Sequence, residues 1–523
     1  MLNWFRDIPK PIWVFTAIWF VLGIAQAALM DLHPDEAYYW QMSRFMDWGY
    51  FHQPPMIAAF IKIGYGLFQN ELGVRLITVL SSTLGILMLF KLSETRNSTA
   101  FLFIFLGLIL THAGVFMAVP DSPLIFFTLV FLLLLKDYLK KDRLVSAIGL
   151  GIIAAALMYS KYHAIVLFAS VILAVPKLFL RKSFWLTIVV GIALFLPHVL
   201  WQFDHDLISF KFHWVVREKK SWNILILLDY LLGQAILLGP VGVVLVFLTW
   251  KTETHSTFDR VLKAVIVGFF SFFFLLALRG KVEPNWTASA FLPLIILGSR
   301  TIDKQQKMWK YLKPSAVIMM VLLFTARVYI ASPVAGKGIK LNFPVRGWEN
   351  WASAIQNKAD GLPVFFANSY QLVSQYSFYS GEQGYHLSPL NYNGNQFDIW
   401  DFDQEQSGKG FALFLGTGPD NSMAVSTEGF KTMYCFKLDD YHSFRNLRFE
   451  FSETGFDVQS STPLELSGMV VNNLSRTINL DSLLEARPVK IFYYLDGDQT
   501  PAETVSCNGY SGILKAGQSK PVS

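Results

Sequence analysis

The sequence has little charge for its length. Only 16% of its 523 residues are Asp, Glu, Lys or Arg and 53% are hydrophobic, whereas soluble domains carry roughly 25% charged residues. This shortage excludes a soluble globular protein. The net charge of +6 does not indicate nucleic-acid binding, because Lys and Arg fall mostly in short runs between apolar segments, which is the pattern of membrane topology. The composition predicts an integral membrane protein.

Cysteine is scarce, and the metal-binding pattern His-Glu-x-x-His is absent. Without that pattern, His52 and His163 are interpreted as hydrogen-bonded side chains rather than metal ligands. The two cysteines, Cys435 and Cys507, are compatible with one disulfide in an oxidising compartment and equally with two buried thiols. The sequence leaves both alternatives open.

Eleven apolar segments are candidates to cross a bilayer, which takes roughly 17 to 25 residues. The first is interpreted as a spanning helix and not as a cleaved signal peptide, because its apolar run of about 18 residues exceeds the usual roughly 7 to 15. Residues 54–70, which open with two prolines, predict a helix along the membrane interface, with a spanning helix as the alternative. The eleven segments are 12–30, 74–90, 98–118, 123–136, 144–160, 162–178, 184–200, 222–249, 261–278, 286–300 and 314–332.

The distribution of Lys and Arg predicts the orientation of these helices. If the N-terminus is cytoplasmic, the inner loops and the N-terminal tail hold about twice as many Lys and Arg as the outer loops, as the positive-inside rule requires. The cations that remain on the outer side stand beside polar motifs, among them Lys161, Arg217 and Arg279. An anionic ligand at the outer face is the simplest explanation for them.

The composition changes after about residue 332, where Gly, Asn, Asp and Ser become more frequent and no segment is long enough to span. We therefore predict a membrane domain at 1–332 and a soluble domain at 333–523 on the same outer face. Strand-like runs at 363–366 and 410–416 flank a polar helical stretch, and 464–494 has mostly strand character. The predicted fold is a polytopic α-helical membrane protein, with about eleven spanning helices plus interfacial helices, and a C-terminal mixed α/β domain.

The acidic pair Asp35-Glu36 follows the first apolar segment, and ionisable groups beside a membrane helix are costly to keep without a task. Asp121, Lys161 and the stretch from Arg279 to Trp286 share the predicted outer face. Carboxylates can accept a proton from an attacking hydroxyl, cations can stabilise a departing phosphate, and aromatic faces can hold a sugar or a lipid chain.

Each of these residues also has a structural interpretation. Asp35 is a favoured residue for capping a helix that starts at Ala37, and Glu36 would then lie in the first turn of that helix. Asp121 stands between prolines and would shape a turn. Lys161 would extend its charged end from a helix terminus toward water.

These motifs together resemble the polyprenyl-phosphate-dependent membrane glycosyltransferases of the C superfamily. The residues that carry the resemblance are the acidic pair with its aromatic run, the Pro54-Pro55 step, the Pro-Asp-Ser-Pro turn at 120–123 and the Val-Glu-Pro-Asn-Trp segment at 282–286. The nearest likeness is to the bacterial branch with lipid A aminoarabinose transferases and protein O-mannosyltransferase-like enzymes. It covers about 1–330, and 368–371 and 395–400 extend it weakly.

The resemblance implies an inverting transfer of a sugar from a polyprenyl (undecaprenyl) phosphate to a periplasmic-side acceptor such as lipid A, another envelope glycan or a protein, at a bacterial inner membrane. Asp35 matches the acidic position taken as catalytic, Asp121 a second acidic position and Lys161 a basic residue near the lipid phosphate. The aminoarabinose transferases carry Glu-Lys where this chain has His52-Gln53, so the resemblance leaves the identity of the donor sugar undetermined.

The predicted site falls into three groups of residues. No cofactor is required and no nucleic-acid partner is expected, although a divalent ion at Asp35 and Glu36 stays an alternative. A transporter or flippase of lipid-linked sugars is the competing function, but transporters place polar groups near the bilayer midplane, whereas here they gather at one face. The predicted catalytic residues are Asp35, Asp121 and Glu36; the donor-binding residues are Lys161, Arg217, Arg279, His52, Gln53 and Tyr38; and the sugar- or acceptor-binding residues are Glu283, Asn285, Trp286, Tyr162, His163, Tyr370, Gln371, Asn395 and Gln396.

Overall fold

A computed structural model of the chain provides the three-dimensional description. It describes residues 7–114, 116–213, 224–302, 304–332, 344–387, 394–400, 402–403, 406–415, 422–427, 429–443, 447–451, 468–472, 477–479, 490–493, 503–506 and 513–522.

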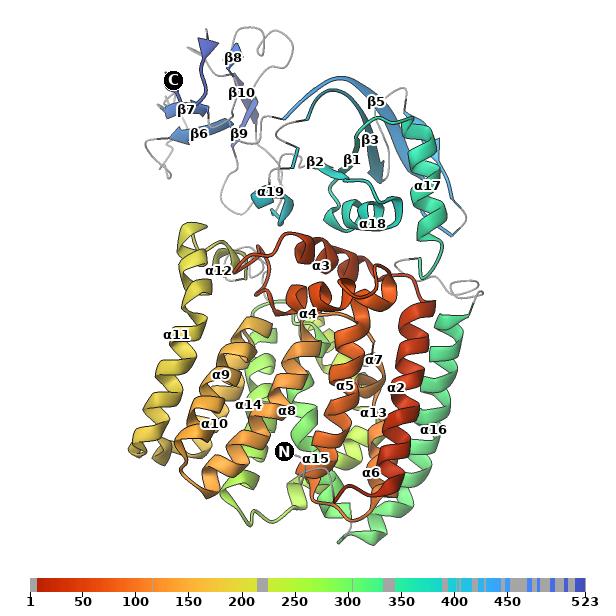
Figure 1. Cartoon of the computed structure of the whole chain (residues 1–523), viewed down its shortest axis with the longest axis vertical. Helices are drawn as coiled ribbons and strands as arrows, with labels where there is room; N and C mark the ends of the chain where they lie inside the picture. Colours follow the sequence, from red (N-terminus) through yellow and green to blue (C-terminus); the bar gives the residue numbers. More distant parts are fainter. Residues whose placement is uncertain are drawn as a thin grey trace.

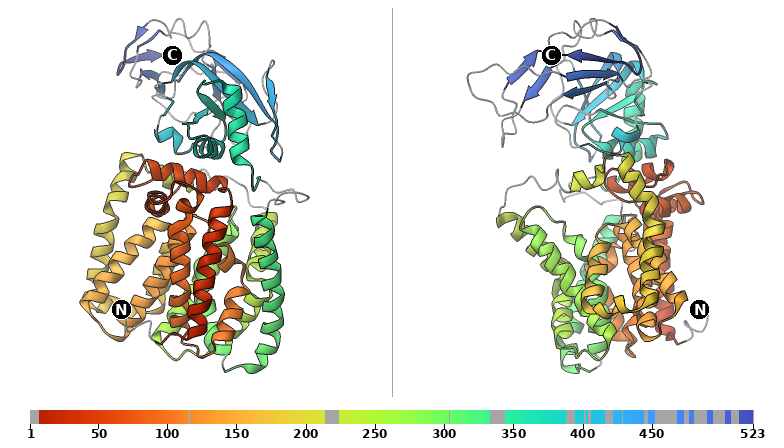
Figure 2. Two further views of the ribbon diagram at one scale, coloured as in Figure 1. Left: turned by 45° about the vertical axis from the view of Figure 1, so that its right-hand side comes forward. Right: turned by 90° about the vertical axis from the view of Figure 1, so that its left-hand side faces the viewer.

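Residues up to 332 form a bundle of helices, and the C-terminal region is stacked on one end of it (Figures 1 and 2). Among the described residues, seven helices are long and apolar enough to cross a membrane. They are α2 (Lys10–Leu29), α5 (Glu71–Ser93), α8 (Asp121–Lys140), α11 (Lys182–Asp204), α13 (Ile224–Lys251), α14 (Thr257–Ala277) and α16 (Gln306–Ala331). A polytopic membrane protein is thus confirmed.

The predicted count of eleven spanning helices is not confirmed, although each of the eleven segments contains a helix. The remaining segments form shorter helices within the bundle, which are α6 (Ser98–Leu106), α7 (Ile109–Ala113), α9 (Leu144–Ser160), α10 (Ala164–Ala174) and α15 (Ala288–Ile302). Short helical turns complete this region: η1 (Pro176–Leu180), α12 (Ile208–Lys211) and η3 (Pro284–Thr287).

The predicted span 98–118 is wrong as a single helix, because the chain breaks between α6 and α7. Gly107 ends α6 and Leu108 is extended, with φ −104° and ψ 134°. The carbonyls released at the break are satisfied by side chains: Thr111 Oγ1 donates to the Leu108 carbonyl at 2.7 Å, and His112 Nε2 lies 2.9 Å from the Leu106 carbonyl. Such local replacement of backbone bonds permits a broken helix inside a membrane domain.

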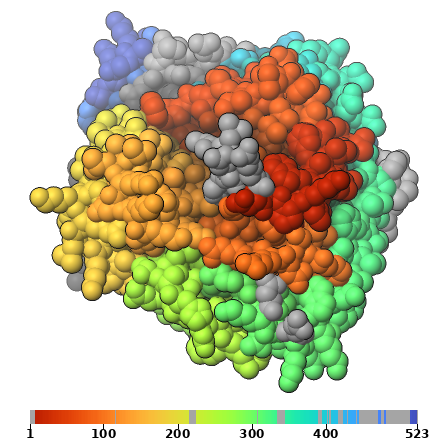
Figure 3. Space-filling model, turned by 60° about the horizontal axis from the view of Figure 1, so that its bottom comes forward, coloured from red at the N-terminus to blue at the C-terminus, as the bar shows by residue number. Residues whose placement is uncertain are grey.

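Helices α3 (Pro34–Arg44) and α4 (Met56–Tyr65) lie across the end of the bundle that faces the C-terminal region (Figure 1). A helix of 10 residues is only about 15 Å long, which is too short to cross a bilayer. The interfacial interpretation of residues 54–70 therefore fits α4 and the spanning alternative does not. Seen from the opposite end, helices from the beginning and the end of the bundle lie side by side (Figure 3), and Arg327 of α16 donates to Gln26 of α2 at 2.7 Å.

The C-terminal region contains a five-stranded sheet in the order β2-β1-β3-β5-β4. Strand β1 (Val364–Ala367) runs parallel to β2 (Tyr385–Leu387) and β3 (Ser407–Leu415), whereas β5 (Met433–His442) is antiparallel to both β3 and β4 (Met423–Val425). Helices α17 (Trp348–Ala359), α18 (Tyr370–Ser380) and α19 (Phe397–Trp400) accompany it. The predicted mixed α/β composition is confirmed.

Further strands lie toward the C-terminus in smaller sheets. A three-stranded sheet has the order β12-β7-β6, and two pairs are β10 with β9 and β11 with β8. The strand character predicted for 464–494 is found in β7, β8 and β9; apart from Thr477, which precedes β8, the rest of that range lies outside the described residues. The strands are β6 (Leu447–Phe451), β7 (Gly468–Asn472), β8 (Ile478–Asn479), β9 (Lys490–Tyr493), β10 (Glu503–Ser506), β11 (Ile513–Leu514) and β12 (Ser519–Val522).

One hydrophobic cluster joins the C-terminal region to α3 of the membrane bundle. Tyr38 and Met42 of α3 belong to the same buried cluster as Phe366 of β1 and Val373 of α18. Cys435 of β5 is a buried free thiol, and its Sγ lies 3.2 Å from the Met423 carbonyl, while Cys507 lies outside the described residues. Because the two parts pack through α3 and α18, residues of both can meet at one site.

Candidate active site

A cavity of about 900 Å³ lies where the bundle meets the C-terminal region. Its lining comes from α3, the chain around Pro54, the start of α8, the α9–α10 connection, the segment before α15 and the start of α18. Most of the predicted site residues line it: Asp35, Tyr38, His52, Gln53, Asp121, Lys161, Tyr162, His163, Glu283, Asn285, Trp286, Tyr370 and Gln371.

Other predicted residues are not part of this lining. Arg279 is exposed at the end of α14 and does not line the cavity. Asn395 and Gln396 are buried one layer behind it, where the Gln396 amide oxygen accepts from the Phe51 N–H at 2.7 Å and the Gln396 N–H donates to Tyr38 Oη at 3.0 Å. Direct ligand binding by Asn395 and Gln396 is therefore not supported, because neither reaches the cavity. Arg217 lies outside the described residues.

Asp35 stands at the start of α3, with its side chain 39% exposed toward the cavity. Helix α3 begins at Pro34, and His33 is its N-cap residue, because His33 Nδ1 accepts from the Asp35 N–H at 3.2 Å. The alternative in which Asp35 caps the helix is therefore wrong. Gln371 of α18 donates from Nε2 to Asp35 Oδ1 at 2.7 Å. The carboxylate is thus held by the C-terminal region while it stays accessible.

Glu36 points the other way, into the protein. Its two oxygens accept from the Arg75 guanidinium at 2.9 and 2.6 Å, from the Ala118 N–H at 2.8 Å and from the His33 N–H at 3.0 Å. Burial alone would raise the pKa of Glu36, but the Arg75 charge and these hydrogen bonds outweigh it and lower that pKa. The predicted catalytic role does not fit, because the carboxylate is fully buried and its hydrogen-bonding capacity is taken.

The engagement of Glu36 also weakens the alternative of a divalent ion at Asp35 and Glu36. Only one of the two carboxylates reaches the cavity. Within the described residues, no group of three or more His, Cys, Asp or Glu side chains lies together as a metal site would need. The arrangement at the start of α3 is that of an accessible acid beside a structural ion pair.

Asp121 and Lys161 form an ion pair in the wall of the cavity. The Lys161 ammonium is 2.9 and 3.0 Å from the two Asp121 oxygens, and Asn285 Nδ2 donates to Asp121 Oδ2 at 2.9 Å. Only 16% of the Lys161 side chain and 13% of the Asp121 side chain are exposed. Lysine has three N–H donors, so the ammonium keeps one for a ligand while Asp121 fixes its position.

Aromatic rings cover much of the remaining wall. Trp286 packs against His163 and Phe273, with ring centroids 4.7 and 5.6 Å away. On the other side, Tyr38 and Tyr370 are 4.4 Å apart. Such surfaces hold apolar chains and the faces of sugar rings.

Tyr39 lines the cavity and was missed as a site residue in the sequence. It forms a side-chain hydrogen bond with Gln53, and it lies close enough to Asp35 and Asp121 for both charges to act on it. Burial raises the pKa of the Tyr39 hydroxyl well above its usual value, and the negative charge of Asp35 raises it further. The available signal was its spacing of four residues from Asp35, which puts both on one face of a helix.

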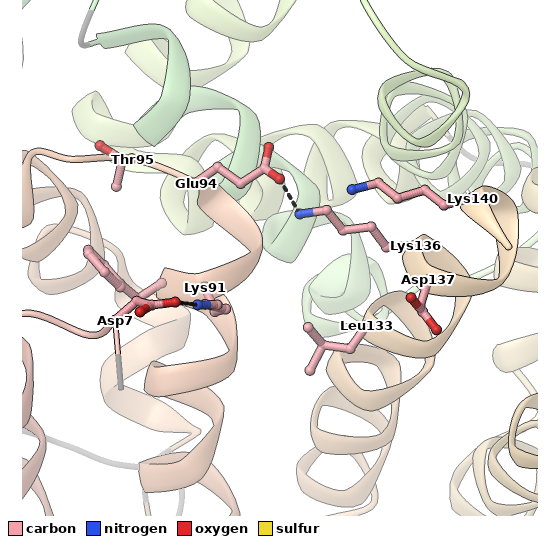
Figure 4. A pocket seen from close by; sticks show the side chains of 9 residues that line it. Asp7, Lys91, Glu94, Thr95, Leu133, Lys136, Asp137 and Lys140 are labelled. Atoms are coloured by element: carbon pink, nitrogen blue, oxygen red, sulfur yellow. Dashed lines mark hydrogen bonds and ion pairs between the residues drawn. The ribbon is translucent and has the colours of Figure 1, made fainter. Parts of the chain in front are cut away.

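A second, smaller cavity of about 450 Å³ lies at the other end of the bundle, between α5 and α8 (Figure 4). It is lined by charged side chains of both signs. Lys136 is 2.6 Å from Glu94, and Lys91 is 3.1 Å from Asp7. Within each pair the two charges neutralise each other, and the pairs connect neighbouring ends of the helices. None of the predicted site residues lines this cavity.

Residues 52–201 match the family model described as dolichyl-phosphate-mannose-protein mannosyltransferase. A search of curated proteins gave no match. Among solved structures, the archaeal oligosaccharyltransferase AglB from Archaeoglobus fulgidus, in complex with an inhibitory peptide and a dolichol-phosphate, is similar at 9% identity and a TM-score of 0.42, covering 77% of this chain and 69% of that chain. Because the TM-score is this low, the similarity does not assign any residue of this chain to a site. The family match confirms, over residues 52–201, the resemblance to polyprenyl-phosphate-dependent glycosyltransferases, and with it the prediction of a membrane glycosyltransferase whose sugar donor is linked to a lipid phosphate.

Proposed function

We propose that the protein transfers a sugar from a polyprenyl phosphate, undecaprenyl phosphate in a bacterial inner membrane, to an acceptor on the periplasmic side, with inversion at the anomeric carbon. The observation that carries this proposal is one cavity at the end of a membrane bundle that combines an accessible acid, Asp35, a held cation, Lys161, and the aromatic wall around Trp286. These are the groups that transfer from a lipid-linked sugar needs.

The reaction follows from the positions of these groups. An acceptor hydroxyl attacks the anomeric carbon, the new carbon–oxygen bond forms as the bond to the phosphate oxygen breaks, and the hydroxyl proton passes to the Asp35 carboxylate. The polyprenyl phosphate leaves with the electron pair, and the Lys161 ammonium stabilises its added charge. If the acceptor is itself a phosphate, it has no proton to lose, and Asp35 only orients it.

Asp121 has a supporting part in this proposal. Because Lys161 and Asn285 donate to its oxygens, it is better suited to hold the ammonium in place than to accept a proton. The aromatic wall around Trp286 would take the first part of the lipid chain, and Tyr370 of the C-terminal region would face the acceptor.

The charges in the cavity favour a neutral donor sugar. Of the described carboxylates in the lining, Asp121 is paired with Lys161, and Glu283 lies 3.1 Å from Lys281. Asp35 is the described lining carboxylate without a Lys or Arg partner, and it is needed for the acceptor. A sugar with an ammonium group would therefore lack a dedicated carboxylate, whereas sugar hydroxyls can bond to Gln53 and His52.

Periplasmic acceptors fit the position of the C-terminal region over the cavity. Lipid A or another envelope glycan would reach the cavity from the membrane surface, and a protein segment would reach it from the outer face. The family match supports a donor sugar linked to a lipid phosphate. The class of acceptor is part of what we propose.

The test is sugar transfer by the purified protein in lipid nanodiscs, with synthetic undecaprenyl phosphates that carry a neutral hexose or an amino sugar, and with envelope lipids and proteins as acceptors. We expect transfer from the neutral donor and a loss of at least about 100-fold in Asp35→Asn, because general-base catalysis contributes roughly 100- to 10,000-fold. The matched control is Asp229→Asn, since Asp229 is exposed on α13 and does not line the cavity.

Two outcomes would contradict the proposal. Undiminished transfer by folded Asp35→Asn would remove the role given to Asp35. Movement of a fluorescent polyprenyl-phosphate sugar across the liposome membrane, with no transfer to any acceptor, would favour the alternative that the protein is a transporter of lipid-linked sugars.

A further inference from the structure

We propose that helix α18 of the C-terminal region positions Asp35 for proton transfer, with Gln371 as the positioning residue, so that the C-terminal region is a working part of the active site and more than a cover. The inference rests on the proposed function, in which Asp35 accepts a proton. It assigns to Gln371 a role different from the sugar or acceptor binding expected from the sequence.

The segment between α2 and α3 depends on outside partners for its position. Residues 30–33 are neither helix nor strand, so neighbouring turns do not fix them. Yet Leu32 is only 1% exposed, and its backbone groups need hydrogen bonds. The Leu32 N–H donates to Tyr379 Oη at 2.7 Å, and the Leu32 carbonyl accepts from Gln375 Nε2 at 2.8 Å. Both partners belong to α18.

Gln371, Gln375 and Tyr379 form one stripe along α18. Their spacing of four residues puts them on the same helix face, and Gln375 and Tyr379 contact the segment that leads into α3. Gln371 completes the stripe by donating from Nε2 to Asp35 Oδ1 at 2.7 Å. The stripe therefore holds the backbone before the acid and the acid itself.

A second contact fixes the same segment from α17. The Asp31 carboxylate accepts from the N–H groups of Gly347 and Trp348, at 2.8 and 3.2 Å, where α17 begins. Charged acceptors at a helix N-terminus are favourable. Two helices of the C-terminal region thus hold Asp31, Leu32 and Asp35 in place, and of these two helices only α18 contacts the Asp35 carboxylate.

The bond from Gln371 determines which oxygen of Asp35 is available. It occupies Oδ1 and so leaves Oδ2 for the acceptor.

The experiment compares Gln371→Leu with the wild-type protein in the transfer assay. We expect kcat to fall by about 10-fold, part of the roughly 100- to 10,000-fold that a positioned base provides, with the KM of the donor unchanged. Gln371→Asn, which keeps the amide, should restore part of the rate, and in an Asp35→Asn background Gln371→Leu should cause no further loss.

Hydrogen exchange separates this inference from the proposed function. Tyr379→Phe and Gln375→Leu break the bonds to Leu32, so deuterium uptake over residues 30–38 should rise in these variants whether or not the protein transfers sugar. A wild type without transfer activity would contradict the proposed function, and the exchange result would then decide alone whether α18 holds the segment. Unchanged uptake, or a Gln371→Leu variant with wild-type kcat, would overturn the inference.

Discussion

Glu36→Gln should lower stability, although the neighbouring Asp35→Asn should not. The Glu36 carboxylate accepts four hydrogen bonds, two of them from a guanidinium that is 1% exposed. A glutamine keeps one acceptor oxygen, so the pair of bonds at the other oxygen is lost and the Arg75 charge stays buried without a counter-charge. Breaking a buried pair in this way costs about 3 to 5 kcal/mol.

The measurement is the thermal unfolding midpoint of the purified protein in detergent. The loss should lower the midpoint by about 5 to 10 °C. Asp35→Asn is the matched control, because it makes the same chemical change one residue away at a side chain that is 39% exposed, and surface changes are usually within about 0.5 kcal/mol. A Glu36→Gln protein as stable as the control would refute the reasoning.

The pH dependence of stability provides a second check on the same pair. Because the folded protein lowers the pKa of Glu36, the carboxylate contributes stability that is fully present above its unfolded pKa of about 4.3. That contribution is lost as the pH falls through the folded pKa. The difference in midpoint between wild type and Glu36→Gln should therefore shrink on acidification below about pH 4. A difference that grows toward acid pH would show that the sign is wrong.

Three further substitutions follow from the structure. Lys161→Met should lower kcat/KM for the donor by at least about 10-fold, since it removes the cation that stabilises the leaving phosphate. The control Lys281→Met, at an exposed ion pair, should change kcat/KM less than 3-fold. Equal effects of the two substitutions would contradict the role given to Lys161. Trp286→Ala should raise the KM for long-chain donors more than for short-chain ones, which transfer assays with both donors would reveal. Gly64→Ala should destabilise by about 1 to 3 kcal/mol, because a Cβ there would lie 2.2 Å from the Gly73 carbonyl oxygen; an unchanged thermal midpoint would contradict the close approach of α4 and α5.

Much of the cavity lining could be predicted because the membrane topology determines on which side of the bilayer each connecting segment lies. Asp35, Asp121 and Lys161 follow or precede apolar segments on the same predicted side, and the helix bundle then brings them together. The presence of apolar helices was equally predictable from long hydrophobic runs. These predictions use local composition and the alternation of sides, and they need no knowledge of packing.

The features that were missed depend on contacts between distant parts of the chain. Glu36 is structural because Arg75, 39 residues away, meets it, and nothing near Glu36 in the sequence signals that pairing. The break after Leu106 depends on Thr111 and His112 satisfying carbonyls of the preceding turn, and a hydropathy window averages over it. The bond from Gln371 to Asp35 joins two regions that look independent in composition.

That bond also sets an order of events during biosynthesis. Gln371 comes 336 residues after Asp35, and at a translation rate of roughly 5 to 20 residues per second the interval between them is roughly 20 to 70 s. During this time the first helices can already be in the bilayer, but the stripe on α18 that completes the acid has not been made. A nascent or truncated chain would therefore hold an unfinished active site, and the carrier-linked sugar would be consumed only after the whole polypeptide has been synthesised and its C-terminal region has folded onto the bundle.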